Sequence, residues 1–300
     1  MKREKKVIKH RVLDRNTVLG IILLAIFAYL MVAFVLGTVV GAIIGIAAVF
    51  AGIEEFETVI YVGCVLASFL MLAIHKRWFY PEFDGCLKFD KRLGRWMLNA
   101  LLVFVILSVP GIVSMLISKA DFAMVSVKSM LVALVAGVSE EIAFRGVPGS
   151  YAMRQINEAK KITMPLIITS LLFALVHGVN LFMGATVQAT VFQMLVAFAG
   201  GCVFFALFLR SGSVLPPMMV HFLYDVCALT NADLVSESGI IQGNLSTRDI
   251  VDNLILVAVE IGVTLFLLRK SVWGDIMDVW EKKWNKKEKE SVQVSEAKAS

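Results

Sequence analysis

Long apolar runs recur along the whole 300-residue chain, and they limit what it can fold into. An α-helix rises 1.5 Å per residue, so about 20 apolar residues cross the ~30 Å hydrocarbon core of a bilayer. Hydrophobic residues make up 58% of the chain, which is too much for a soluble protein of this length. The sequence predicts an all-α polytopic membrane protein with about eight transmembrane helices, over Thr17–Phe50, Thr58–Ile74, Trp96–Ile117, Phe122–Met153, Ile162–Gly178, Ala185–Leu209, Val214–Thr230 and Val251–Leu268.

The first run, Thr17–Phe50, follows a basic N-terminal stretch. It is far longer than the apolar region of a secretory signal, so we expect it to remain in the mature protein. As a helix it would measure roughly 50 Å and must tilt, bend or project from the bilayer. Gly37, Gly41 and Gly45 permit either a bend or close packing of a second helix, and packing is the expected role.

Lysine and arginine alternate between successive loops, which sets the orientation. They follow the second, fourth, sixth and eighth runs, and these loops are expected in the cytoplasm. The other loops are poor in them, with Glu54, Glu55 and Glu57 after the first run and the stretch Thr230–Ser246 after the seventh. Both termini are therefore predicted to be cytoplasmic, in a multi-pass protein of the cell membrane. The net charge of +5 is explained by orientation, and no nucleic acid partner is expected.

Five segments follow from this reading. Residues 1–16 form a basic cytoplasmic tail, 17–121 the N-terminal transmembrane helices, 122–230 a core that carries the ionisable residues described below, 231–269 an outer loop and the last transmembrane helix, and 270–300 a cytoplasmic segment. In the last segment a helix with apolar side chains at helical spacing is expected to lie at the membrane interface, before a polar tail that is expected to be disordered. Those side chains are Trp273, Ile276, Met277, Trp280 and Trp284. Cys64, Cys202 and Cys227 lie in apolar runs and are expected to be reduced thiols.

The fourth run contains Ser-Glu-Glu-Ile-Ala-Phe-Arg-Gly, residues 139–146. An ion at the centre of a membrane helix costs about 2.5–3.5 kcal/mol even on permissive scales. Glu141 and Arg145 are four residues apart and share a helix face, which suits an internal ion pair. Glu140 is turned about 100° away and is free for chemistry. The alternative reading is that these charges only mark the cytoplasmic end of the helix.

Two histidines in other apolar runs favour the chemical reading. His177 ends Phe-Ala-Leu-Val-His, and His221 begins His-Phe-Leu-Tyr-Asp, which places Asp225 one helical turn after it. A single histidine in an apolar run is usually a structural residue, whereas a carboxylate one turn away can hold or polarise the imidazole. Ionisable side chains within membrane segments are functional candidates by default.

The depths of these residues agree if the fourth run continues to Met153. Counted at 1.5 Å per residue from the cytoplasmic ends of their helices, Glu140 then lies at ~20 Å, His177 at ~22 Å and His221 at ~16 Å. Pro148 and Gly149 make this extension irregular, so we expect a kink or a short break there, with Arg145 buried as a partner of carboxylate.

The order Glu-Glu-x-x-x-Arg, Phe-x-x-x-His and His-x-x-x-Asp on successive membrane helices resembles the CAAX protease and bacteriocin-processing (CPBP) family of intramembrane proteases, also called the Abi family. The residues that match are Glu140, Glu141, Arg145, Phe173, His177, His221 and Asp225, within about Phe122 to Thr230. Asparagine is the familiar last residue in the prenyl-protein proteases, so Asp225 resembles the wider bacterial branch. The resemblance implies an intramembrane CAAX-type endopeptidase, with a metalloprotease and a metal-free protease left as alternatives.

The residue types suit hydrolysis of a peptide bond. A glutamate beside a histidine can activate water and pass its proton to a leaving amine, and a second histidine can stabilise the oxyanion. The same groups, Glu140, His177 and His221, are alternatively candidate ligands of Zn²⁺. The His-Glu-x-x-His pattern of the familiar zinc proteases is absent, so metal dependence stays open. Asn180 is expected at the outer rim of the site beside the substrate, together with Phe173.

The expected substrates are hydrophobic or lipid-anchored peptides that already lie in or on the lipid bilayer: a leader, a pheromone precursor, a bacteriocin or a CAAX-like peptide. Two alternatives remain. One is a non-catalytic scaffold or bacteriocin-immunity protein of the same fold, and the other is a transporter that couples to protons. Paired broken helices in two halves would favour the transporter, and the sequence shows none. Glu260, alone among apolar residues of the last run, is expected to face the protein interior. The oligomeric state is left open.

Overall fold

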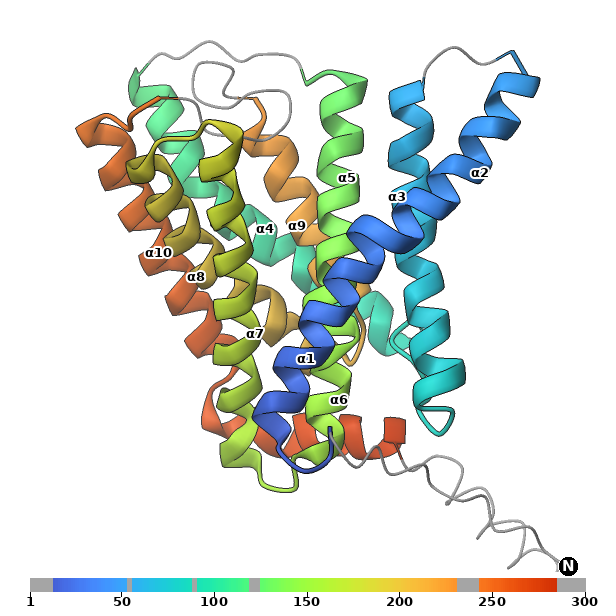
Figure 1. The fold of residues 1–300 in the computed structure, drawn as a ribbon. Helices are drawn as coiled ribbons and strands as arrows, with labels where there is room; N and C mark the ends of the chain where they lie inside the picture. The colour runs from blue at the N-terminus through green and yellow to red at the C-terminus, as the bar shows by residue number, and fades with distance from the viewer. Residues whose placement is uncertain (1–12, 53–55, 88–90, 119–124, 231–242, 285–300) are drawn as a thin grey trace, which may run out of the picture.

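The computed structural model describes residues 13–52, 56–87, 91–118, 125–230 and 243–284, and within these ranges it is helical and contains no strand. The helices form an upright bundle with one helix lying across its lower end (Figure 1). Several sequence predictions concern residues outside the described ranges: the tail over residues 1–12, Glu54 and Glu55, the loop over 231–242, and the polar tail from residue 285.

The first apolar run is one long helix made of α1 (Thr17–Leu30), a π-helical segment η1 (Met31–Leu36) and α2 (Gly37–Phe50). Asn16 caps its start by accepting a hydrogen bond from the backbone N–H of Leu19. The helix crosses the bundle diagonally, inclined to the upright helices beside it (Figure 1). The predicted glycine packing is confirmed at Gly41, because a Cβ placed on Gly63 of the next helix would lie 2.8 Å from its Cα.

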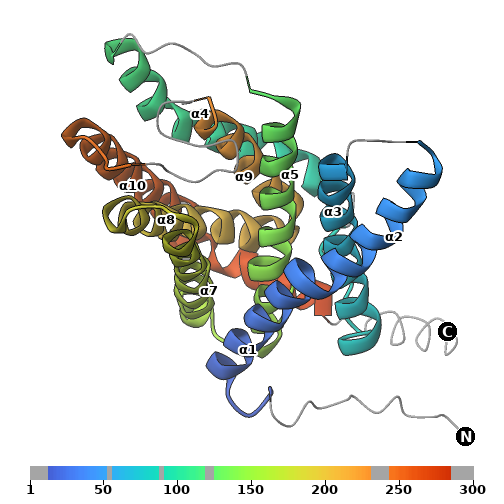
Figure 2. The same ribbon diagram turned by 45° about the horizontal axis from the view of Figure 1, so that its top comes forward.

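Two further long helices complete the N-terminal part. They are α3 (Phe56–Ile74), which continues as the π-helical η2 (His75–Phe79), and α4 (Lys91–Ser118). Figure 2 shows α2 and α3 together at one side of the bundle and α4 on the opposite side of α5. The described residues contain six helices long and apolar enough to span a membrane, which cover residues 17–50, 58–79, 91–117, 159–183, 187–211 and 247–267.

The other two predicted spans are the helices that carry the charged residues. The fourth run is divided into α5 (Val127–Glu141), the π-helical η3 (Ile142–Gly146) and α6 (Pro148–Gln155). Pro148 stands at the first position of α6, where its missing N–H costs nothing, so the predicted break falls just before it. The seventh run forms α9 (Leu215–Ala228), whose 14 residues are too few to cross the hydrocarbon alone.

The remaining helices surround α5 and α9. A short 3₁₀ turn (Ala159–Ile162) leads into α7 (Thr163–Val176), which continues as the 3₁₀ segment η5 (His177–Met183); α8 (Val187–Ser211) and α10 (Thr247–Leu267) follow. Gly212 ends α8 at φ 69°, the left-handed conformation that glycine adopts without strain. A Cβ on Gly137 of α5 would lie 2.9 Å from the backbone nitrogen of Phe222, so α5 and α9 touch along their backbones. Figure 2 shows both at the centre of the bundle.

The C-terminal helix, residues 273–284, lies across the lower end of the bundle, as the red segment of Figure 1 shows. Its apolar face was expected to enter the membrane interface, but Ile276, Trp280 and Trp284 are buried against protein. Phe83 stacks on the ring of Trp284 at a centroid distance of 4.4 Å, and Trp280 donates to the carbonyl of Leu209 at 3.0 Å. The helix therefore closes the end of the bundle.

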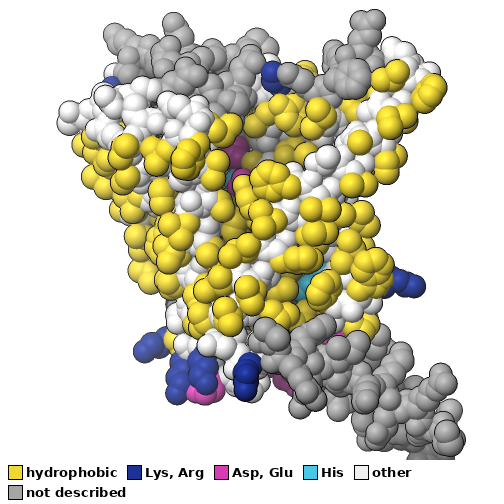
Figure 3. Space-filling view, viewed as in Figure 1, with side chains coloured by type: hydrophobic (Ala, Val, Ile, Leu, Met, Phe, Trp, Pro, Cys, Tyr) yellow, Lys and Arg dark blue, Asp and Glu magenta, His cyan; other side chains and the backbone are white. Residues whose placement is uncertain are grey.

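All four cysteines are free thiols, as predicted for three of them. The first and last described parts of the chain lie at the same end, because the hydroxyl of Tyr151 donates to the carbonyl of Leu13 and the ring of Tyr80 packs on both Tyr151 and Trp284. Lysine and arginine side chains gather at this end (Figure 3), which we call the basic end.

Candidate active site

The two glutamates lie near the midpoint of the stretch from Val127 to Gln155, where the α-helix becomes a π-helix. The π-helical segment is closed by a hydrogen bond from the N–H of Val147 to the carbonyl of Ile142 at 3.0 Å. Such single π turns occur often at functional sites, because the extra residue redirects the side chains. Here the segment carries Arg145, and every residue from Glu141 to Gly146 is buried.

Arg145 and Glu141 form the predicted ion pair. The guanidinium Nη1 donates to Oε1 of Glu141 at 2.8 Å, and both side chains are completely buried. Nη2 donates to the backbone carbonyl of Gly201 on α8 at 3.0 Å, and the guanidinium lies over the ring of Phe173 at 4.5 Å. Arg145 is thus held by three elements and is an internal partner of carboxylate, which excludes the alternative that it marks a helix end at the membrane surface.

His221 lies between three carboxylates. Its Nδ1 is 3.0 Å from Oε1 of Glu141, the same oxygen that binds Arg145. Its Nε2 is 3.5 Å from Oδ2 of Asp225, one turn along α9, and 3.8 Å from Oε2 of Glu140. A carboxylate only accepts, so Nδ1 donates to Glu141 and the ring is fixed in one orientation. Nε2 then faces the two remaining acids.

His177 is linked to His221 by the ring of Phe173, which packs on both histidines. Its Nδ1 is 2.9 Å from the carbonyl of Phe173, which can only accept, so Nδ1 is the protonated nitrogen and a neutral ring carries its lone pair on Nε2. The ring of Phe173 lies 5.0 Å from that of His177 and 5.6 Å from that of His221, measured between centroids. Phe173 is therefore the shared contact between the two histidines.

Asn180, predicted at the rim, lies in η5 and donates from Nδ2 to Oε1 of Gln193 on α8 at 2.8 Å. This bond ties η5 to α8 next to His177. A contact of Asn180 with substrate stays a prediction.

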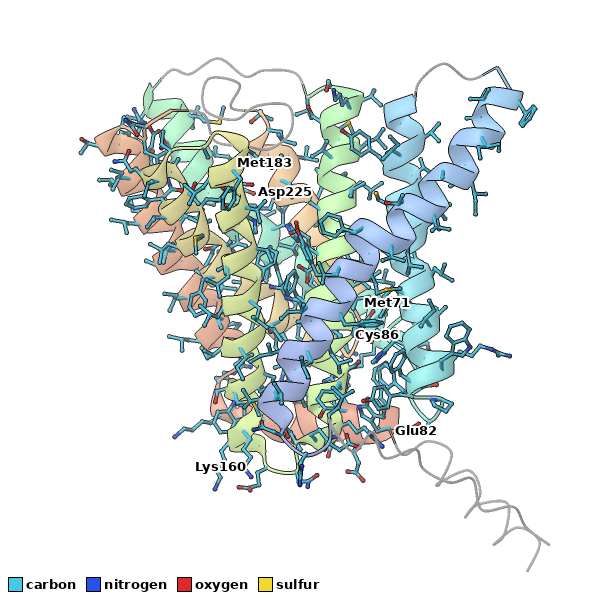
Figure 4. All side chains as sticks on the ribbon, viewed as in Figure 1. Met71, Glu82, Cys86, Lys160, Met183 and Asp225 are labelled. Carbon is cyan, nitrogen blue, oxygen red and sulfur yellow. The ribbon has the colours of Figure 1, made fainter. Side chains whose placement is uncertain are left out.

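The side chains form two layers. Glu141 and Arg145 are fully buried, whereas Glu140 and Asp225 keep 25% and 28% of their side-chain surface exposed. Acidic side chains and a histidine are visible through an opening in the apolar surface between α7 and α5 (Figure 3). Asp225, labelled in Figure 4, lies at this level. The exposed acids therefore border a space that opens sideways from the bundle, above a closed ionic layer.

The zinc ligands considered above are not brought together in this structure. Within the described residues, no three His, Cys, Asp or Glu side chains converge as a metal-binding group. The hydrogen bonds of Nδ1 in His177 and His221 leave Nε2 of each ring as the atom that would bind a metal, so the residue types suit zinc while their spacing does not. We derive no step through zinc from Glu140, His177 and His221.

Sequence reasoning missed two elements of the site. Phe204 of α8 stacks on His221 with ring centroids 4.8 Å apart, and the carbonyl of Gly201 holds Arg145. The adjacent glycines Gly200 and Gly201 were a signal, because a glycine pair inside an apolar helix indicates that another group approaches the backbone closely. A Cβ on Gly201 would lie 3.0 Å from Nη2 of Arg145.

The bundle brings three carboxylates, two histidines and an arginine together in its interior. Residues 121–227 match the family model described as type II CAAX prenyl endopeptidase Rce1-like, and this match covers every charged site residue. The chain is a multi-pass integral membrane protein with an Rce1-like domain, consistent with a CPBP-family intramembrane protease. Searches of curated proteins and of solved structures gave no match.

Proposed function

We propose that this protein is an endopeptidase that hydrolyses a peptide bond of a hydrophobic or lipid-anchored peptide, with water activated by Glu140. The observation that carries the proposal is the division between the two adjacent acids. Glu141 is committed to Arg145 and His221, whereas Glu140 is partly exposed at 3.8 Å from Nε2 of His221. A general base must reach both water and substrate, and of the two adjacent glutamates only Glu140 has an exposed face.

The remaining roles follow from the hydrogen bonds. Glu140 takes a proton from water as the oxygen attacks the carbonyl carbon, and it then passes this proton to the leaving amine. His177 presents a lone pair on Nε2 and is assigned to position the water. In its imidazolium form His221 donates through Nδ1 to Glu141 and through Nε2 to the developing oxyanion, and the neighbouring carboxylates balance its charge. Arg145 and Glu141 are positioning residues.

The substrate class follows from the surroundings of the opening. The outer face of α7 and η5, the elements that carry Phe173 and His177, has exposed apolar residues such as Leu171, Leu175 and Val179, so we expect a peptide to reach the acids from the membrane. Leaders, pheromone precursors, bacteriocins and CAAX-like peptides share the required chemistry: an apolar or lipidated segment next to an extended backbone.

The decisive experiment is a cleavage assay on such peptides with the purified protein, comparing Glu140→Gln with Glu141→Gln. Glu140→Gln keeps the shape but cannot take a proton, so kcat should fall about 10²- to 10⁴-fold while peptide binding and folding stay normal. Glu141→Gln leaves Arg145 without its carboxylate and should lower the yield of folded protein together with activity. Normal turnover by Glu140→Gln would refute the assignment and favour a non-catalytic scaffold or immunity protein.

A second measurement concerns metal. Because the proposed steps use side chains alone, cleavage should survive treatment with a strong chelator, and the purified protein should contain less than one equivalent of zinc. Loss of activity with the chelator and its recovery on adding Zn²⁺ would replace this mechanism with a metal-assisted one.

A further inference from the structure

A second buried histidine lies toward the basic end, outside the active site. His75 on η2 is 1% exposed, and its Nε2 is 2.9 Å from the hydroxyl of Ser150 on α6. That hydroxyl has one proton and lies 2.6 Å from the carbonyl of Gly146 and 3.0 Å from that of Val147. Carbonyls only accept, so Ser150 donates to one of them and must accept from Nε2 of His75.

The hydrogen bonds of His75 leave one atom unsatisfied. With the proton on Nε2, a neutral ring carries a lone pair on Nδ1, and this atom is buried without a hydrogen-bond partner. A buried acceptor without a partner costs about 1–3 kcal/mol. The position therefore suits a ligand that brings an O–H or N–H donor.

His75 lines a cavity of about 480 Å³ between α3 and the segment that follows η2. Five of its lining residues are apolar, namely Phe69, Leu72, Ala73, Phe83 and Leu87. Lys76 and Asp84 also line it, and Nζ of Lys76 donates to the backbone carbonyl of Asp84 at 3.0 Å. Lys76 and Ala73 are exposed, so the cavity opens to the outside of the bundle. Burial raises the pKa of the Cys86 thiol, which also lines the cavity, to about 12; the thiol therefore stays uncharged, and the cavity is not a second nucleophilic site.

The opening lies where a membrane surface would be. Above it, Leu66 and Leu70 of α3 are exposed apolar residues, and below it Trp78 is 69% exposed beside Arg77. Tryptophan next to basic residues is typical of the level of lipid head groups. The lining of this cavity thus combines the ammonium of Lys76, the acceptor Nδ1 of His75 and several apolar side chains.

Phe69 also lines a second cavity of about 470 Å³, which lies between α3, α4, α5 and α9. Its walls are apolar and include Met97, Val138, Met218 and Phe222. Phe69 lines both cavities, so its side chain forms the wall between them, and an apolar chain in the first reaches the second only when that side chain turns aside. Met218 and Phe222 belong to α9, the helix that holds His221.

We propose that these two cavities form a binding site for one phospholipid whose anionic head group carries a hydroxyl, as in phosphatidylglycerol. The phosphate lies by the ammonium of Lys76, the head-group hydroxyl donates to Nδ1 of His75, and an acyl chain passes Phe69 to lie against α5 and α9. The bound chain then supports the packing of α9, and so the position of His221, from the side opposite to any substrate.

The test uses the full-length protein in nanodiscs that contain phosphatidylglycerol and phosphatidylcholine in equal amounts, followed by native mass spectrometry of the lipid that stays bound after release. The wild type should retain phosphatidylglycerol about tenfold over phosphatidylcholine, the ratio expected from one satisfied acceptor together with one ionic contact. Ala73→Trp, which fills the cavity but removes no hydrogen bond, should abolish this preference. Leu70→Trp, one turn away on the exposed part of α3, is the matched control and should behave as the wild type.

Two further arms identify which contact selects the lipid. Phosphatidic acid offers the phosphate without the hydroxyls of the glycerol head group, so the wild type should retain less of it than of phosphatidylglycerol. His75→Phe lacks the acceptor and should retain the two lipids equally. Equal retention of phosphatidylglycerol and phosphatidylcholine by the wild type, or an unchanged preference in Ala73→Trp, would overturn the proposal. The readout is binding, so the result is independent of whether the protein cleaves peptides.

Discussion

Two glutamates are completely buried in this bundle, and their surroundings are opposite. Glu141 on α5 is 0% exposed and bonds to both Arg145 and His221. Glu260 on α10 is 1% exposed, and its Oε2 is buried without a hydrogen-bond partner among the described residues. Both surroundings include a glycine of α8. Arg145, the partner of Glu141, donates to the carbonyl of Gly201, and a Cβ on Gly200 would lie 3.0 Å from Oε1 of Glu260.

The comparison teaches that burial alone does not identify a carboxylate that belongs to the candidate active site. A buried charge is stable only when it is paired and hydrogen-bonded, and the surroundings of Glu141 supply both. Those of Glu260 supply a neighbouring glycine, and within the part of the chain that the structure describes they supply no hydrogen bond to Oε2. We therefore expect the two positions to respond differently to substitution, and the predictions below run from the largest effect to the smallest.

The largest effect is expected for Arg145→Ala. It leaves Glu141 buried without its cation and should destabilise the protein by about 3–5 kcal/mol, the usual result of breaking a buried ion pair on one side. The measurement is the fraction that remains monodisperse after heating in detergent, with activity measured per folded molecule. Arg145→Lys keeps the charge but cannot bond Glu141 and Gly201 together, so it should be intermediate. Stability equal to the wild type in Arg145→Ala would show that the pair is not essential to the fold.

A smaller effect is expected at the two glycines. In Gly201→Ala the new Cβ would lie 3.0 Å from Nη2 of Arg145 and 3.2 Å from Phe173, so it should displace the guanidinium, cost about 1–3 kcal/mol and lower kcat. Gly200→Ala meets only the flexible carboxylate of Glu260 at 3.0 Å, and it serves as the neighbouring control with activity close to the wild type. A larger loss of activity in Gly200→Ala than in Gly201→Ala would show that the contact of α8 with Glu260 matters more for the reaction than its contact with Arg145.

The smallest effect is expected for Glu260→Gln. This change keeps the shape, and no charged partner is lost, so thermal stability should change by less than about 1 kcal/mol and kcat should stay the same. Glu140→Gln in the same assay is the contrasting variant. A loss of activity in Glu260→Gln without loss of folded protein would show that Glu260 takes part in the reaction and that the distinction drawn here between the two buried acids is wrong.

The sequence by itself determined the features that depend on local spacing and on hydrophobicity. The four-residue separation of Glu141 and Arg145 places them on one helix face, and the structure contains that ion pair. The cost of a carboxylate in lipid predicts that Glu260 turns inward, and it does. The excessive length of the first apolar run predicts that this helix tilts, bends or projects from the bilayer, and α1 and α2 cross the bundle diagonally. Each of these follows from helix geometry and the bilayer, without knowledge of which helices are neighbours.

Only the tertiary structure decided which groups from distant helices meet. Sequence spacing pairs His221 with Asp225, but the packing of α9 against α5 gives Nδ1 of His221 to Glu141 and leaves Asp225 at 3.5 Å on the other nitrogen. The apolar face of the C-terminal helix is compatible with lipid or protein, and its tryptophans pack on Phe83 because that segment folds beneath the bundle. Hydrogen bonds and packing between remote segments depend on backbone approach at glycines such as Gly137 and Gly201, which local periodicity does not encode.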